Sequence, residues 1–140
     1  MSGQSFYDPL YVAFLYYFNR ERDYFECHEV MEALWLEEGR DALYQGLLQV
    51  AVSLHHHRND NIDGAVKLMN AAIDKLEGRD SVVLGIDLNR LIIDAAGHLS
   101  ALTHNGEIPF HFQDMDIRIL DPALNALIDN FDPATLEVGH

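Results

Sequence analysis

The sequence predicts an all-α protein, a compact single-domain bundle of five or six helices over residues 1–140. Two observations support this prediction. Apolar residues recur every three or four positions through successive segments, which is the period of an α-helix that buries one face. Asp or Asn stands at the start of these segments, where its side chain can cap a helix. The period-two alternation typical of strands is confined to residues 116–120.

The helices follow one another along the chain without a Ser/Gly-rich linker or a repeat. Their expected ranges are about 10–18, 23–37, 40–59, 61–78, 88–105 and 122–130. The first and the last follow Asp8-Pro9 and Asp121-Pro122, each of which places a capping residue before the residue preferred at the first helical position. The second has a wide apolar face and ends near Gly39, because glycine often follows a helix.

The middle helices carry other local signals. Gly46 lies inside the third helix at a cost of about 1 kcal/mol relative to alanine, so we expect another helix to approach closely there. Asn61 or Asp63 caps the fourth, and the fifth follows Asp87 and ends by residues 105–106. Residues 107–116 contain a proline and no helical period, which predicts a loop packed on the bundle.

The balance of charge excludes one class of partner. Asp and Glu number 23 while Lys and Arg number nine, so the formal net charge is −14. Because phosphate binding depends on Lys and Arg contacts, no nucleic acid is expected as a partner. Only two of the nine bases are lysines, and Asp is the commoner acid. This pattern favours a halophilic protein that works in concentrated salt, and an ordinary acidic protein is the alternative.

No segment predicts a membrane span or a secretion signal. The longest apolar runs, residues 10–18 and 43–54, are shorter than the ~20 residues that cross a bilayer. The first nine residues lack the basic start and apolar core of a signal peptide. Cys27 is the single cysteine, so no internal disulfide can form, which fits a reducing compartment. We therefore expect a cytoplasmic protein with no membrane partner.

Polar side chains interrupt the apolar faces of the second and third helices. His28 and Glu32 lie one turn apart on the second helix, between apolar neighbours. Gln45, Gln49 and His56 share a narrow stripe on the third helix. Burying such groups without partners costs several kcal/mol when they are charged. We expect the two stripes to face each other and to satisfy each other's hydrogen bonds.

Residues 18–68 carry a long ordered motif, which reads FNRERDYFECHEVMEALW, then RDALYQGLLQVAVSLHH and then NIDGAVKL. This motif resembles the domain of unknown function 309 family of small helical proteins. The resemblance implies a compact helical bundle and supplies no activity. The residues that match the family pattern are Glu26, His28, Glu29, Glu32, Trp35, Gln45, Gly46, Gln49, His55 and His56. His57 lies outside this pattern, as does Asp60, where glycine is expected.

Two classes of function are open. One is a small enzyme or small-molecule-binding protein with a pocket between the two helices, in which His28, Glu29 and Glu32 are the catalytic candidates and a carboxylate acts as general base. Its other binding residues would be Glu26, Trp35, Gln45, Gln49, His55 and His56. The other class is a non-catalytic, self-associating interaction module, in which the same polar residues form a hydrogen-bond network that fixes helix register.

A divalent metal is a further alternative for this pocket. The spacing from His28 to Glu32 resembles the zinc-protease motif His-Glu-x-x-His with its second histidine replaced by glutamate. Zinc proteases need both imidazoles, so this activity is excluded. His28 and Glu32 could still bind a metal with His56 of the facing helix, because helical bundles often hold metals with carboxylate and histidine ligands.

Overall fold

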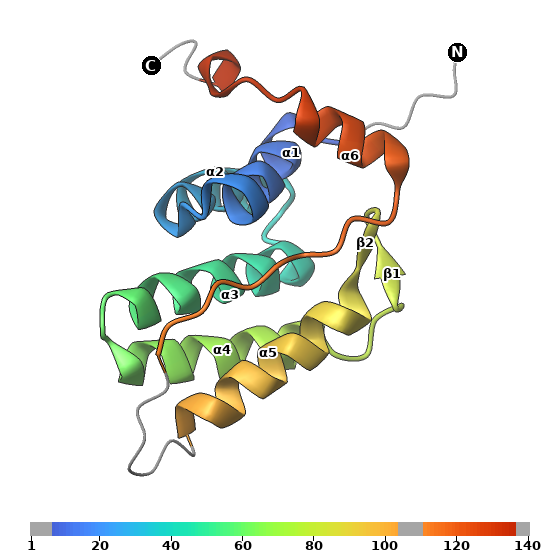
Figure 1. Ribbon diagram of the computed structural model, residues 1–140. Coiled ribbons are helices and arrows are strands. Elements are labelled where there is room, and N and C mark those ends of the chain that lie inside the picture. The colour runs from blue at the N-terminus through green and yellow to red at the C-terminus, as the bar shows by residue number, and fades with distance from the viewer. Residues whose placement is uncertain (1–6, 104–110, 137–140) are drawn as a thin grey trace.

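The computed structural model describes residues 7–103 and 111–136 (Figure 1). Six α-helices dominate this part of the chain, so the all-α prediction is confirmed. A short π-helix, η1, continues the first helix, and a 3-10 turn, η2, follows the last. The bounds of the helices are α1 Pro9–Tyr16, η1 Tyr17–Glu21, α2 Tyr24–Glu37, α3 Ala42–Arg58, α4 Ile62–Leu76, α5 Leu88–Thr103, α6 Pro122–Asp129 and η2 Pro133–Leu136.

The helices pack on one another in chain order. α1 packs on α2, α2 on α3, α3 on α4 and α4 on α5, and α6 returns to α1. Figure 1 shows the extended segment after residue 110 running past α3 toward α6. One cluster of buried side chains includes members of all six α-helices. The two helices with the candidate polar stripes, α2 and α3, are therefore direct neighbours.

Side-chain caps begin most helices where the sequence predicts them. Asp8 accepts a hydrogen bond from Leu10 N at 2.8 Å, and Asp121 accepts one from Ala123 N at 2.9 Å. Of the two candidates before α4, Asn61 is the cap. Each cap satisfies a backbone N–H that has no partner within the helix.

The turn before α4 keeps the backbone shape that the family pattern implies. Asp60 stands where the pattern has glycine, and its φ of 68° lies in the left-handed region that glycine adopts freely. Asp is among the few other residues that tolerate this region. The departure from the pattern at this position therefore leaves the turn intact.

Gly46 lies at the contact between α3 and α4. A Cβ added there would lie 2.7 Å from Leu76 Cδ2, so the expected close approach of another helix is confirmed. The absence of a side chain lets the two helix backbones come closer than they could with alanine. This contact fixes how α3 sits against α4 and so how its other face meets α2.

A small hairpin that the sequence did not predict lies before α5. Strands β1 (Val82–Val83) and β2 (Ile86–Asp87) pair antiparallel, and Ile119 forms an isolated bridge with Ile86. Ile119 belongs to the segment whose alternation is the one strand signal in the sequence. Asn19 anchors the same segment, because its side chain donates to Ile117 O at 2.7 Å and accepts from Ile117 N at 2.9 Å.

The C-terminal end of the fifth predicted helix and the first residues of the predicted loop lie outside the described residues. From residue 111 onward the chain is extended, and Met115 and Ile117 are buried against the bundle. Among the helices of the described ranges, none combines the length and the apolarity needed to cross a bilayer.

Candidate functional site

The polar motif begins where the chain turns from η1 into α2. Arg22 adopts φ 55°, which ends the π-helix, and the Asp23 carboxylate then accepts from Glu26 N at 3.1 Å to start α2. From this start, Tyr24 and Cys27 point into the core with no exposed surface. His28 lies at the border between this buried face and solvent.

The carboxylate beside His28 is that of its neighbour in sequence. His28 Nδ1 lies 3.3 Å from Glu29 Oε2, and the two side chains are 37% and 52% exposed. Glu32 is exposed and has no hydrogen bond or ion pair in the described structure. A hydrogen-bond network that fixes helix register would pair Glu32 with His28 or with a glutamine of α3, and Glu32 forms no such bond in the described structure.

A small cavity lies between α2 and α3 beside this imidazole. Its volume is about 180 Å³, and it is lined by Tyr24, Phe25, His28, Val52 and His55. The ring centroid of Phe25 lies 6.4 Å from that of His28 and 6.1 Å from that of His55. One imidazole from α2 and one from α3 thus lie beside the Phe25 ring, although the α3 histidine expected on the polar stripe was His56. The histidine that α3 contributes is His55.

Burial controls the charge of His55. Desolvation lowers its pKa below the ordinary value, and His56, Arg58 and His28 lower it further, against a smaller raising effect of Asp23. At neutral pH the His55 ring is therefore uncharged, with one nitrogen as donor and the other as acceptor.

The wall formed by Tyr24 is held rigidly. Its hydroxyl donates to Asp114 at 2.7 Å, and the guanidinium of Arg58 stacks over its ring at 4.5 Å from the centroid. Burial, followed by the nearby Asp114, raises the pKa of Tyr24, so the hydroxyl keeps its proton at any physiological pH. The cavity thus has a fixed side, Tyr24, and an exposed side, Phe25.

The expected hydrogen bonding between the two stripes is not formed. Gln49 Oε1 on α3 and Trp35 Nε1 on α2 are buried and have no hydrogen-bond partner within the described structure. Gln45 is half-buried. The half-buried Trp35 ring lies under the guanidinium of Arg40, which is 5.1 Å from the ring centroid. A buried polar atom without a partner costs about 1–3 kcal/mol, so these atoms do not form a stabilising lock.

His56 has a structural role at the end of α3. Its Nδ1 lies 3.1 Å from Asn61 Nδ2, and Asn61 Oδ1 in turn accepts from Gly64 N to cap α4. His56 is therefore part of the turn between α3 and α4. Within the described ranges no group of three His, Cys, Asp or Glu side chains could hold a metal ion. The expected ligand set of His28, Glu32 and His56 gains no support from this arrangement.

Glu26 faces a second cavity on the outer side of α2. This cavity has a volume of about 590 Å³, and Glu29 also lines it. Its other walls are largely apolar side chains of α1, α2 and η2. Cys27, between these positions in sequence, is buried, and burial raises its pKa, so the thiol is not a nucleophile. Residues of the α2 motif therefore line two cavities, with His28 at one and Glu26 and Glu29 at the other.

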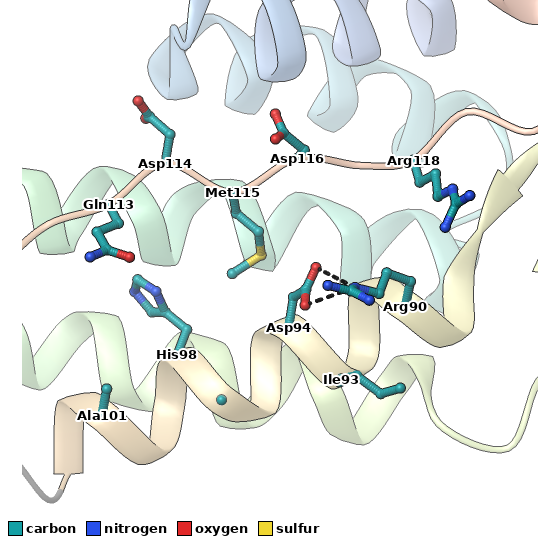
Figure 2. A pocket seen from close by; sticks show the side chains of 11 residues that line it. Arg90, Ile93, Asp94, His98, Ala101, Gln113, Asp114, Met115, Asp116 and Arg118 are labelled. Atoms are coloured by element: carbon teal, nitrogen blue, oxygen red, sulfur yellow. Dashed lines mark hydrogen bonds and ion pairs between the residues drawn. The ribbon is translucent and has the colours of Figure 1, made fainter.

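A third and larger cavity involves residues that no sequence motif singled out. It is a groove of about 860 Å³ between α5 and residues 113–118, and Figure 2 shows His98 on its floor. His98 Nε2 lies 3.1 Å from His57 Nδ1, and both rings are buried. Desolvation, followed by His57, lowers the pKa of His98 to about 4. A histidine in helical register with Leu91, Ala95 and Leu102 on the buried face of α5 was the signal that could have revealed it.

The chain around the α2–α3 cavity is similar to known proteins. Residues 11–68 match the family model described as Domain of unknown function (DUF309). The resemblance to this family is therefore confirmed. The matched segment covers most of α1, all of η1, α2 and α3, and part of α4. It includes every residue that lines the cavity between α2 and α3, but only part of the lining of the second cavity.

The chain is also similar to one curated protein, over more residues than the family model matches. The chain is 41% identical over 91 residues to a protein named "Uncharacterized protein YpuF" from Bacillus subtilis (strain 168). The aligned region covers 61% of this chain and 52% of that relative, so the chain spans about half of the relative's length. Neither comparison supplies an activity.

Proposed function

We propose that the protein binds a small single-ring aromatic molecule in the cavity between α2 and α3. The observation behind this proposal is the meeting of His28 and His55 at a cavity whose other walls are Tyr24, Phe25 and Val52. Its volume of about 180 Å³ is close to the 150 Å³ at which an apolar cavity binds benzene. The size of the cavity therefore suits one ring with a short substituent.

The two imidazoles favour a ligand that donates a hydrogen bond. The Glu29 carboxylate beside His28 Nδ1 favours the tautomer with its proton on that nitrogen, which leaves Nε2 as an acceptor. His55 is uncharged at neutral pH and offers a second acceptor or donor. A ring with a hydroxyl or an amine fits this site, whereas the nearby Glu29 disfavours a carboxylate-bearing ring.

Titration of the full chain with phenol, benzylamine and benzoate tests this proposal, with amide shifts measured by NMR. Phenol and benzylamine should produce saturable shifts at Phe25, His28 and His55, and benzoate should bind at least several-fold more weakly. His55→Gln should weaken binding, while the matched control His111→Gln, an exposed histidine outside the cavity, should not. Shifts that are absent, or that His55→Gln leaves unchanged, would refute the proposal.

A non-catalytic interaction module is the second candidate, because α2 exposes two large apolar side chains. Phe25 is 54% and Leu36 is 50% exposed, and they share one helical stripe with the exposed Glu29 and Glu32. If this stripe mediates self-association, light scattering should find a dimer that Leu36→Lys converts to a monomer. A monomer at all concentrations would exclude this candidate.

A further inference from the structure

The groove between α5 and residues 113–118 lies outside the segment that matches the family model, and neither candidate function above uses it. Its volume of about 860 Å³ exceeds those of the α2–α3 cavity and of the second cavity beside α2. One side of the groove is α5, which contributes Gly97, His98 and Ala101 to its lining. The extended segment forms the other side (Figure 2). A cavity of this size can hold a molecule larger than a single ring.

Three carboxylates line the groove, and each is already engaged. Asp94 is paired at 3.1 Å with the arginine one turn before it on α5. Asp116 pairs with Arg22 at 2.5 Å, and Asp114 accepts from the Tyr24 hydroxyl at 2.7 Å. Figure 2 shows the side chains of Asp114 and Asp116 pointing away from α5. The acidic groups therefore do not control the charge inside the groove.

Two arginines lie at one end of the groove. Arg118 points toward α5, and its guanidinium has no hydrogen bond, ion pair or ring contact in the described structure. Arg90 uses only its Nε to bind Asp94, so its terminal nitrogens stay available. In a chain with 23 acids and nine bases, an arginine without a carboxylate partner beside a second arginine is unexpected. Guanidinium groups bind phosphate and carboxylate through two parallel hydrogen bonds.

The rest of the floor suits a flat group. A Cβ added at Gly97 would meet nothing within 4 Å, so the helix surface there opens directly into the groove. Met115 projects from the opposite wall, and His98 lies one residue further along α5. Arg90 and His98 are eight residues apart, which is about 12 Å along a helix. A ring over Gly97 would therefore be within one small molecule's length of the arginines.

We propose that this groove binds a small molecule in which an oxyanion, either a phosphate or a carboxylate, is joined to an aromatic ring. Arg118 and Arg90 hold the oxyanion, and the ring lies over Gly97 against Met115. The net charge of −14 does not prevent this, because exposed charges further away than about 8 Å are screened at physiological salt. Each carboxylate that lines the groove already has a partner, and none of these partners is Arg118, so its guanidinium is available for an oxyanion.

NMR titration of the full chain with phenyl phosphate, benzoate and inorganic phosphate tests this assignment, with amide shifts followed at Gly97, Met115 and Arg118. Phenyl phosphate and benzoate should both bind, and the tighter of the two identifies the oxyanion. Inorganic phosphate should bind at least several-fold more weakly than phenyl phosphate, because it lacks the ring.

Two variants separate the parts of the site. Arg118→Gln should weaken binding roughly tenfold or more, since it removes a charge-assisted hydrogen bond. Gly97→Leu should abolish binding by filling the groove, and it should fold well because the added Cβ has no atom within 4 Å and glycine disfavours a helix. The control is Arg79→Gln, an exposed arginine that donates to Lys75 O outside the groove.

Two results with these variants would overturn the proposal. Loss of binding in Arg79→Gln to the same extent as in Arg118→Gln would show only general attraction between an arginine and an anion. Retention of binding in Gly97→Leu would place the ligand elsewhere on the chain. His55→Gln should leave this binding unchanged, so failure here and failure of the α2–α3 cavity are distinguishable.

Discussion

Replacement of Gly46 by alanine tests the contact that sets the spacing of α3 and α4. The added Cβ would lie 2.7 Å from Leu76 Cδ2, 2.9 Å from Leu76 Cγ and 3.3 Å from Lys75 Cβ. Leu76 is fully buried, so it can move only by disturbing its neighbours. Overpacking of a core costs about 1–3 kcal/mol, and loss of a mid-helix glycine returns about 1 kcal/mol. We expect Gly46→Ala to lower the free energy of unfolding by about 1 kcal/mol.

Gly97→Ala is the matched control, because it makes the same change inside another helix without a clash. No atom lies within 4 Å of its added Cβ, so the free energy of unfolding should rise by about 0.5–1 kcal/mol. Urea unfolding followed by circular dichroism measures both variants, and unchanged m-values would show that the unfolded state is unaffected. Equal stability of the two variants would refute the close approach of α4 to Gly46.

Three further predictions follow from the charges. The pKa of His98 is lowered from 6.5 to about 4, so the unfolded state takes up the proton first as the pH falls. The free energy of unfolding, measured in urea, should therefore fall between pH 6.5 and pH 4. The loss should be about 1–2 kcal/mol, because solvent in the groove weakens the effect of burial, and His98→Gln should reduce it. Because KCl screens the repulsion within a chain of net charge −14, the melting temperature should rise steadily with KCl concentration and rise less with sucrose. A melting temperature that does not change with KCl concentration would contradict a halophilic protein. Glu32→Ala should change the free energy of unfolding by less than about 0.5 kcal/mol, because Glu32 is exposed without a partner; a loss above 1 kcal/mol would restore its pairing with His28.

The candidate site could be predicted in part because helical periodicity assigns a side chain to a face. The position of His28 at the edge of the apolar face of α2 follows from that periodicity, and so does its meeting with α3. The partner on α3 could not be predicted, because adjacent histidines differ by about 100° around a helix and the crossing of the two helices selects one. His55 therefore lines the cavity, His56 joins the turn before α4, and His57 is buried against His98.

The sequence by itself determined the helices, because caps, prolines and apolar periodicity act within a few residues of each boundary. It also determined the close contact at Gly46, since a glycine is tolerated inside a helix chiefly where a neighbouring backbone leaves no room for a side chain. Only the tertiary structure decided which groups meet across 40 or more residues. His57 of α3 meets His98 of α5, at a separation of 41 residues along the chain. Over a shorter separation, Arg118 comes to face α5 because the extended segment returns along the bundle after that helix. No local sequence pattern predicts the path of this extended segment, since that path depends on how buried side chains from all six helices pack together.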